Sequence, residues 1–543
     1  MKIPHTLRRP FTHKRSRETG SLGLNPAVKI LHNSRKSITI TKICEKQSPS
    51  LGANWRPITV KQQISPSTIR DHQPSLENHD ISPPDFGSVR CGDHYRKVCD
   101  RTGTTCPHRV KLSKDWNFMR HFPLWLTGLL IACLISLAPS THAQGFVRAD
   151  HQHIVDGKGD PLILRGLGLG GWMVQEGYMM GLSNLKAQHI IRSRISRIIG
   201  EKKTEQFYQS WRDNAVTKAD IDAMAGWGFN SVRLPMHWNL FIKGTPGRNA
   251  TGRIAWNEEG FRRVDALIAW LKANDMFLIL DMHAAPGGQG HDTAISDRDP
   301  DKPSLWDSRD NQEKMIALWS EIARRYKDEP TIAGYDLLNE PNWGFQDKND
   351  KGGCRETGNE PLRDLYERTI RAIRAIDSNH MLIIEGNCWG NNYLGMLPIA
   401  DRNTALSFHK YWTPTTQESI EPFLKLREQY DMPLWNGESG ENSNDWYARA
   451  VALQERNGIG WSWWPLKKIG AGNPLEIKTG ADYHRLSAYL RGEGNKPPAK
   501  AAFNGLMQLA ADSRFDRNAY HQDVVDALLG ASDRHKKRPS GSQ

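Results

Sequence analysis

Between about residue 146 and residue 466, short apolar runs alternate with longer stretches whose apolar residues recur every three or four positions. The short runs have the length and composition of buried β-strands, and the longer stretches have the period of amphipathic helices. Eight strands that alternate with helices predict an α/β fold, the (β/α)8 TIM barrel, as a single catalytic domain. The predicted strands are 162–169, 231–235, 277–282, 332–338, 381–385, 404–408, 433–436 and 459–464, and the clearest helices are 221–227, 261–273, 313–326 and 362–376.

Two glutamates lie where predicted strands end, which is where such barrels carry their chemistry. Glu340 ends the apolar run DLLNEP, whose proline prevents the strand from continuing, and Glu438 ends the run MPLWNGE. Cleavage of a glycosidic bond requires two acids, because one protonates the leaving oxygen while the other attacks the anomeric carbon or activates water. A single glutamate in such a place is more often a solvated turn residue, so neither motif decides the function alone.

Other predicted strands end in side chains that suit the same chemistry. Arg233 would hold a neighbouring carboxylate ionised and oriented, although a surface ion pair is the alternative. His283, His409 and Tyr411 offer hydrogen bonds to sugar hydroxyls or to the two carboxylates. Metal binding by the histidines is the rival interpretation, but the sequence contains no His-Glu-x-x-His or comparable set. We therefore predict neither a metal nor a cofactor.

Residues 166–171 (GLGLGG) match the dinucleotide-binding pattern G-x-G-x-x-G. The residues that follow are not a convincing helix start, and the region about twenty residues further on is basic where an acid that binds ribose is expected. We interpret the glycines as a tight exit from the first strand that brings Trp172 and Glu176 toward the barrel mouth.

The chain contains 19 Trp, and several lie at predicted loop positions. Flat indoles stack on the C–H faces of pyranose rings, so they favour a glycan substrate, although ordinary core packing explains about half of them. Trp463 and Trp464 point to opposite sides of the last strand, so only one can lie under a sugar. The other candidates are Trp172, Trp238, Trp343, Trp389 and Trp412.

The formal net charge of +13 is typical of a nucleic-acid-binding protein, but it is concentrated in one segment. Residues 1–118 carry 21 Lys/Arg against 9 Asp/Glu, which is nearly the whole excess, and they lack an apolar period. This segment is therefore predicted to be disordered or a mis-assigned upstream extension. The remainder is close to neutral, which argues against a nucleic-acid partner.

Residues 119–143 have the three parts of a secretory signal peptide: a short basic start, an apolar core and a small-x-small exit before Gln144. The alternatives are a tailed membrane anchor and a lipoprotein with its lipid on Cys133, which the apolar residues up to Leu137 disfavour. We predict a secreted or periplasmic protein whose catalytic domain is 144–515, followed by a C-terminal tail, 516–543.

Two further features concern the predicted domain. Residues 154–161 form a hairpin through an Asp-Gly turn and are expected to plug the barrel bottom, while 466–499 are a long excursion that could wall the cleft. Cys354 and Cys388 lie in neighbouring loops, where an oxidising compartment could pair them; two unpaired thiols are the alternative.

Taken in order, these residues resemble glycoside hydrolase family 5, the cellulase-like retaining enzymes, over roughly 150–466. The opening Gly-Gly-Trp with Glu176, and the run DMHAAPG, are similar to the exo-β-1,3-glucanase branch. That branch usually has proline at Gly177 and tryptophan at Ser439, so the linkage and the choice between exo and endo action stay open. The pieces of the resemblance are Arg165, Gly170 to Glu176, Arg233, His283, Asn339, Glu340, His409, Tyr411, Glu438 and Trp464.

The resemblance implies Glu340 as acid/base and Glu438 as nucleophile. It also implies that Asn339 binds the sugar 2-hydroxyl, that Tyr411 hydrogen-bonds the nucleophile and that His409 tunes the acid/base. The predicted substrate-binding residues are Glu176, Arg233, His283, Asn339, His409, Tyr411 and Trp464.

The predicted function is therefore that of a retaining β-glycosidase, which hydrolyses a β-1,3- or β-1,4-linked glucan by double displacement. Its expected partner is an oligo- or polysaccharide, with no nucleic acid and no stable membrane partner, and the chain is expected to be a monomer. The alternatives are a mannanase or a glycosylceramidase of the same fold, or a barrel that only binds glycans. A binding-only barrel would lack one of the two glutamates or have it displaced.

The signal-like segment generates the first testable prediction. Because a signal peptide is read only at an N-terminus, translation is expected to start at Met119, and the native protein is expected to begin near Gln144. N-terminal sequencing and the intact mass of the native protein check this. Native peptides from residues 1–118 would contradict it.

Overall fold

The computed structural model describes residues 145–244 and 252–530. The predicted extension 1–118 and the predicted signal peptide 119–143 lie outside these residues. None of the described helices is both long enough and apolar enough to cross a membrane.

Eight parallel strands close into a barrel, which confirms the predicted fold class. Each strand pairs with the next one along the chain, and the last pairs with the first through Trp461 opposite Arg165. All eight predicted strands are present, with ends that differ by a few residues. The strands are β3 (Arg165–Gly168), β4 (Ser231–His237), β5 (Phe277–Ala284), β6 (Ile332–Asp336), β7 (Met381–Glu385), β8 (Thr404–Tyr411), β9 (Leu434–Gly440) and β10 (Gly460–Trp464).

Helices connect most of these strands, and side-chain caps fix where several of them begin. The Ser308 hydroxyl accepts a hydrogen bond from the Asn311 N–H, and the Ser443 hydroxyl accepts one from the Trp446 N–H, which satisfies free donors of a first helical turn. The connecting helices are α4 (Lys218–Trp227), α5 (Glu258–Lys272), α7 (Arg309–Tyr326), α8 (Glu360–Arg374), α10 (Glu421–Tyr430) and α11 (Asn444–Arg456), with the short elements η3 (Trp238–Leu240), α6 (Thr293–Ser296) and η4 (Gln417–Ser419).

The connection from β7 to β8 departs from the strand-helix alternation. Its helical element, α9 (Asn387–Gly390), is four residues long, and Cys388 and Trp389 have left-handed φ values of 58° and 54°. Cys388 forms a disulfide with Cys354 of the loop after β6. Of the two alternatives for the cysteines, the structure has the pair, which joins two neighbouring loops at the same end of the barrel.

The amino-terminal end of the barrel is closed as predicted. β1 (Arg148–Asp150) and β2 (His153–Val155) form an antiparallel pair, and Val155 also bridges Pro161 across the turn that begins at Asp156. Val147 and Ile154 are buried in one cluster with strand residues such as Ile279. Because this end is plugged by apolar side chains, ligands reach the barrel from its carboxyl-terminal end.

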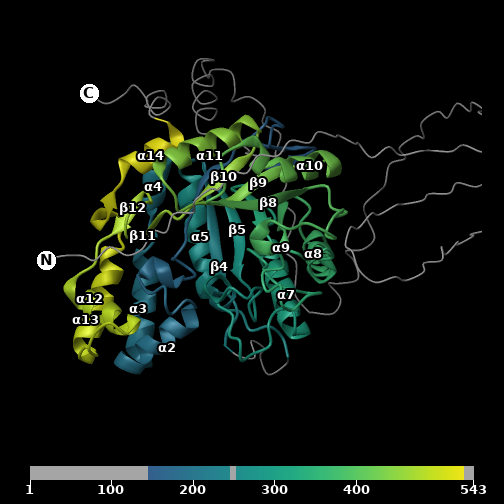
Figure 1. Ribbon diagram of the computed structural model, residues 1–543. Helices are drawn as coiled ribbons and strands as arrows, with labels where there is room; N and C mark the ends of the chain where they lie inside the picture. The colour runs from purple at the N-terminus through teal and green to yellow at the C-terminus, as the bar shows by residue number, and fades with distance from the viewer. Residues whose placement is uncertain (1–144, 245–251, 531–543) are drawn as a thin grey trace, which may run out of the picture. The chain divides into compact units, whose positions relative to one another are not determined.

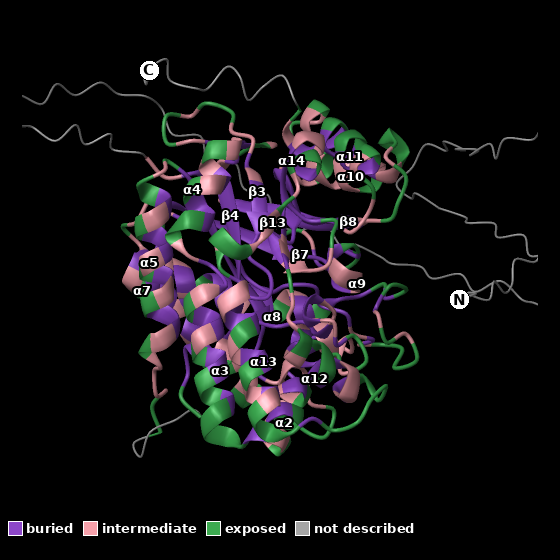
Figure 2. Cartoon of the chain, turned by 90° about the vertical axis from the view of Figure 1, so that its left-hand side faces the viewer, coloured by how far each residue is buried: buried purple, intermediate pink, exposed green. Residues whose placement is uncertain are grey.

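A group of helices lies beside the barrel and joins segments from far apart in the chain. Figure 1 shows α2 (Gln188–Ile199) and α3 (Glu201–Asn214), in blue, beside α12 (Ala481–Arg491) and α13 (Ala499–Asp512), in yellow. Figure 2 shows that the barrel strands are almost wholly buried, whereas these helices expose one face. Neither α2 nor α3 is among the helices expected from the sequence, because their moderate apolar stripes are interrupted by many charged residues.

The chain after β10 is folded up to Leu529. β11 (Lys467–Ile469), β12 (Leu475–Ile477) and β13 (Ala519–Tyr520) form a small sheet, and α14 (Gln522–Leu529) packs against α11. The helix buries Val524, Val525 and Leu528. The first half of the segment expected to be a tail thus belongs to a packed surface, and residues 531–543 lie outside the described part.

Candidate active site

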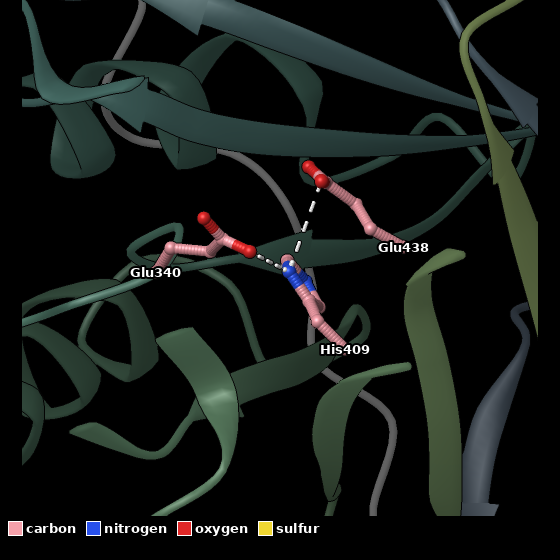
Figure 3. Close-up of side chains that lie close together, drawn as sticks. All are labelled: Glu340, His409 and Glu438. Carbon is pink, nitrogen blue, oxygen red and sulfur yellow. Dashed lines mark hydrogen bonds and ion pairs between the residues drawn. The ribbon is translucent and has the colours of Figure 1, made fainter. Parts of the chain in front are cut away.

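Glu340, His409 and Glu438 converge at the carboxyl-terminal end of the barrel (Figure 3). They come from the loop after β6, from β8 and from β9, whose ends meet because the strands are parallel. Nδ1 of His409 lies 2.6 Å from Oε1 of Glu340 and 3.8 Å from Oε2 of Glu438. One nitrogen of His409 and one oxygen of each glutamate lie within 4.8 Å of one another. Two carboxyl groups therefore face one small volume.

The backbone of Glu340 has an unusual conformation that its surroundings hold in place. Its φ is 44°, in the left-handed region that a side chain disfavours. The Glu340 N–H donates a 2.7 Å hydrogen bond to Oε2 of Glu385, the last residue of β7. Strain of this kind persists only where neighbouring groups fix it, and the hydrogen bond to Glu385 helps hold the backbone from which the Glu340 carboxyl extends.

The Glu340 carboxyl has a raised pKa. Burial is the largest cause, and the negative charges of Glu438 and Glu385 raise the pKa further, while the His409 cation lowers it. Glu340 therefore keeps its proton to higher pH than an ordinary glutamate does.

Glu438 is held by two donors. Nη1 of Arg233 donates to its Oε1 at 2.5 Å, and the Tyr411 hydroxyl donates to its Oε2 at 3.0 Å. Charge-assisted hydrogen bonds to a carboxylate stabilise the ionised form and fix its rotamer. This arrangement suits a carboxylate that must remain negative while it meets a substrate.

Arg233 is completely buried and lies among several carboxylates. Its guanidinium lies 3.2 Å from Asp281, 2.8 Å from Asp336 and 3.1 Å from Glu385, besides its bond to Glu438. Burial by itself lowers the pKa of Arg233, but the surrounding carboxylates raise it well above its ordinary value. The arginine is therefore a fixed positive charge below the site.

On the other side of the pair, Glu176 and His283 face each other. His283 Nε2 lies 3.7 Å from Glu176, and burial raises the pKa of Glu176 to about 7. Burial lowers the pKa of His283, but Asp281, which is 2.8 Å from its Nδ1, helps raise it to about 10. The Trp464 ring stacks on the His283 ring at a centroid distance of 5.2 Å, and its N–H donates to Tyr178 at 2.8 Å.

The glycines of 166–171 allow the Trp464 ring to pack closely against the backbone. A Cβ atom at Gly168 would lie 2.5 Å from the Trp464 ring, and one at Gly170 would lie 2.7 Å from it. These positions need glycine for close packing of an indole, which agrees with the rejection of a dinucleotide site. Glu176 faces the barrel mouth as predicted, but Trp172 does not; its N–H donates to the Arg212 carbonyl of α3.

Asn339 presents a free donor. Its Oδ1 accepts from Nη2 of Arg233 at 2.7 Å, whereas its Nδ2 is buried without a hydrogen-bond partner among the residues that the structure describes. A buried amide donor without a partner is costly, and a ligand oxygen would satisfy it.

The predicted tryptophans divide between core and surface. Trp463 packs against Tyr447 in the core, opposite to Trp464, as the strand geometry requires. Trp343 stacks on His291 at 4.1 Å, and Trp412, next to Tyr411, is 69 % exposed. The structure thus brings together the nine predicted site residues and leaves one indole exposed beside them.

The triad of Glu340, His409 and Glu438 has a donor set that could hold a cation. Burial lowers the pKa of His409, but the charges of Glu385, Glu438 and Glu340 raise it well above its ordinary value. A protonated imidazole has no lone pair for a metal ion, and its N–H is directed at Glu340. The arrangement therefore fits a hydrogen-bonded acid pair better than a metal site.

Sequence reasoning missed several residues of this site. Asp281, Asp336 and Glu385 are buried carboxylates that contact Arg233, and Tyr178 holds Trp464. Glu385 could have been found, because it ends a predicted strand just as Glu340 and Glu438 do. Tyr178 gave no such signal, since it lies in η2 (Gly177–Met180) within a long loop.

Comparison with known proteins shows which family the chain resembles. A family model described as "Cellulase (glycosyl hydrolase family 5)" matches residues 197–469. A β-xylosidase from Phanerodontia chrysosporium is 28% identical, over 63% of this chain and 75% of that protein. Endoglucanase C from Acetivibrio thermocellus is 24% identical, over 47% and 85% respectively. A probable glucan 1,3-β-glucosidase A from Aspergillus niger is 25% identical, over 41% and 49%.

The contacts of Glu385 generate a prediction about His409. Glu385 lies 3.1 Å from His409 Nε2, and its negative charge is the largest contribution that raises the pKa of that imidazole. In Glu385→Gln the charge is lost, so His409 should lose its proton at a lower pH than in the parent protein. NMR titration of the 15N-labelled imidazole measures the change.

Glu356→Gln provides the control, because Glu356 is a buried carboxylate in the loop after β6 that accepts backbone N–H groups of Gln346 and Asp347. The titration curve of His409 in Glu356→Gln should match the curve of the parent protein. An unchanged curve in Glu385→Gln would show that Glu385 does not set the charge of His409.

Proposed function

The chain belongs to glycosyl hydrolase family 5 and is a glycoside hydrolase with a polysaccharide-type substrate, and from this premise we propose that it is an exported, retaining β-glycosidase that acts on a β-glucan. Glu340 is the acid/base of this reaction and Glu438 is its nucleophile. The spacing of the two carboxylates carries the proposal.

That spacing favours the retaining reaction over the inverting one. Retaining enzymes hold their two carboxyl groups about 5 to 5.5 Å apart, whereas inverting enzymes need roughly 6.5 to 9.5 Å to admit a water molecule. Oxygens of Glu340 and Glu438 lie within 4.8 Å of each other. This separation supports direct attack by one carboxylate on the anomeric carbon.

In the first step, the Glu438 carboxylate attacks the anomeric carbon, and the Glu340 carboxyl gives its proton to the leaving oxygen. Arg233 and Tyr411 keep the Glu438 carboxylate ionised and aimed. The free Asn339 amide donates to the sugar 2-hydroxyl, a bond that strengthens as positive charge develops on the ring.

In the second step, Glu340 acts as a base. It removes a proton from water, which attacks the same carbon and releases Glu438, so the configuration is retained. The His409 imidazolium, 2.6 Å from Glu340, stabilises the carboxylate that exists between the two steps. Glu176, His283 and Trp464 form the wall that binds the sugar itself.

The names of two relatives support a glucan as substrate, since one is an endoglucanase and one a glucan 1,3-β-glucosidase. The β-xylosidase favours a β-xyloside as a second candidate, and mannans and glycosylceramides are further alternatives of the same fold. Product analysis on laminarin, cello-oligosaccharides, xylo-oligosaccharides and mannan distinguishes these substrates. Release of ceramide from a glycosylceramide would identify the remaining alternative, and a protein with no turnover on any of these substrates would contradict the proposed activity.

Export, a monomeric state and the boundaries of the mature domain are part of the same proposal. The signal-like segment 119–143 supports export to the periplasm or the medium. The Cys354–Cys388 disulfide agrees with an oxidising compartment.

Replacement of each glutamate in turn tests the proposed roles of Glu438 as nucleophile and Glu340 as acid/base. Glu438→Gly should lower kcat by several orders of magnitude, on the order of the 10⁶-fold losses seen when a catalytic nucleophile is removed. Azide should restore turnover with an inverted, α-configured glycosyl azide, because it attacks from the vacated face. Glu340→Ala should instead keep glycosylation by a substrate with a good leaving group and give a β-configured azide product.

NMR of the azide products reads out the configuration. The opposite stereochemical result in the two variants would require that the roles of Glu340 and Glu438 be exchanged. Full activity in both variants would mean that the site is wrong.

The His409 charge generates a prediction about pH. Because the His409 cation lowers the pKa of Glu340, its removal in His409→Ala should raise that pKa. Glu340 would then stay protonated to higher pH, so the alkaline limb of the kcat/KM profile should move to higher pH while kcat falls, by roughly 10²-fold or more.

His153→Ala, at the exposed barrel bottom, is the control and should keep the parent profile. If the alkaline limb of the kcat/KM profile does not move in His409→Ala, His409 does not influence the pKa of Glu340.

A further inference from the structure

A second cavity lies outside the reaction centre, between the barrel and the helices α2 and α3. Its volume is about 220 Å³, and it opens between the loop after β3, these two helices, η3 and the start of α5. None of the residues that line it belongs to the set around Glu340 and Glu438. The residues that carry the argument are Gln175, Tyr208, Trp172, Trp211, Arg212 and Asn239.

The floor of this cavity contains polar groups without partners. Gln175 is 2% exposed, and neither the oxygen nor the nitrogen of its side-chain amide has a hydrogen-bond partner among the described residues. The hydroxyl of Tyr208, which is 4% exposed, also has none in that part of the chain. Buried polar groups are normally satisfied, so these three atoms indicate an occupant that supplies donors and acceptors.

The charged groups around the cavity are already paired. Arg212 binds Glu259 at 2.6 Å and Glu205 at 3.2 Å, and Arg192 binds Glu205 at 2.9 Å. Each guanidinium is matched by a carboxylate, so a phosphate or a carboxylate would have to break an existing pair. The chemistry therefore favours a neutral occupant.

Aromatic side chains provide the remaining surface. Trp172 and Trp211 are buried, and their indole N–H groups are used by the Arg212 and Gly171 carbonyls, so they offer ring surface rather than donors. A ligand for this cavity needs an apolar face beside groups that both donate and accept. The hydroxyls of a pyranose ring do both, and a vicinal pair of them matches the two atoms of an amide.

We propose that this cavity binds one pyranose unit of a neutral carbohydrate, at a second site that is separate from the reaction centre. Its volume is below the roughly 300–1,000 Å³ of sites for drug-sized ligands, which agrees with a single ring. Glu176 and Gln175 are consecutive, yet Glu176 faces His283 and Gln175 lines the cavity. The proposal rests on the proposed function, since it assumes that glycans are the ligands of this protein.

A sugar in this cavity would sit directly behind the loop that carries Glu176. Exposed groups at the rim, including Asn239 and Glu205, leave room for a chain to continue into solvent. The ligand is therefore either a free monosaccharide or the end unit of a longer glycan, and the chemistry that recognises the ring is the same for both.

Fluorine NMR of the full protein tests the site, because its tryptophans report the two places separately. In Glu438→Gln protein labelled with 5-fluorotryptophan, methyl β-D-glucopyranoside should shift the signals of Trp172 or Trp211 as well as that of Trp464, with two different binding curves. Tyr208→Phe should weaken the binding that the Trp211 signal reports by roughly twofold to tenfold, the usual net effect of losing one hydrogen bond. Gln175→Met, which keeps the length and removes both polar atoms, should do the same.

Lys202→Ala is the matched control, since Lys202 is an exposed residue of α3 that does not line the cavity. If the Trp211 signal reports tighter binding of cellobiose or laminaribiose than of methyl β-D-glucopyranoside, the ligand is the end unit of a longer glycan. Equal affinities would identify a free monosaccharide. If no sugar moves the Trp172 and Trp211 signals while the parent enzyme hydrolyses glycans, the second site is wrong and the proposed function stands. If the enzyme hydrolyses no glycan, the proposed function fails independently of these signals.

Discussion

Arg233 is a completely buried cation at the centre of the barrel, in contact with carboxylates from β5, β6, β7 and β9. An isolated charge would be very unfavourable in such a place, and so would any of the acids without it. The guanidinium makes their joint burial possible, because its fork of donors reaches several carboxylates at once. The ends of these strands are thereby fixed relative to one another before any substrate is considered.

The reaction centre is built directly on this charge cluster. Glu438 accepts from Arg233, Asn339 presents its free amide because its oxygen is bound to Arg233, and Glu385 connects Arg233 with both His409 and the strained backbone of Glu340. One buried cation thus positions both carboxylates and gives them different surroundings. Burial and His409 shift the pKa of Glu340, whereas the Glu438 carboxylate accepts hydrogen bonds from an arginine and a tyrosine. Environments that differ in this way allow two chemically identical side chains to take different roles.

The local sequence predicted the fold well, for a physical reason. Strands with both faces buried require continuous apolar runs, and the helices that cover them require apolar residues every three to four positions. Both patterns can therefore be recognised in the amino-acid sequence. The strand ends at Glu340, Glu438 and Arg233 were visible for the same reason. The four-residue α9 was not predicted, because two left-handed residues and a disulfide replace the expected helix. The helices α2 and α3 were missed because they are buried against α13, a segment about three hundred residues away.

By itself, the sequence determined that the chain forms eight alternating strands and helices and that acids, an arginine and two histidines end those strands. Only the tertiary structure decided that Glu385, Asp281 and Asp336 share one guanidinium, that Glu340 adopts a left-handed backbone, and that Gln175 and Tyr208 face a second cavity. Periodicity is a property of neighbouring residues, and each segment carries it alone. Contacts between residues that are about 50 to 200 positions apart exist only after the barrel closes, since closure brings the strand ends to within hydrogen-bond distance.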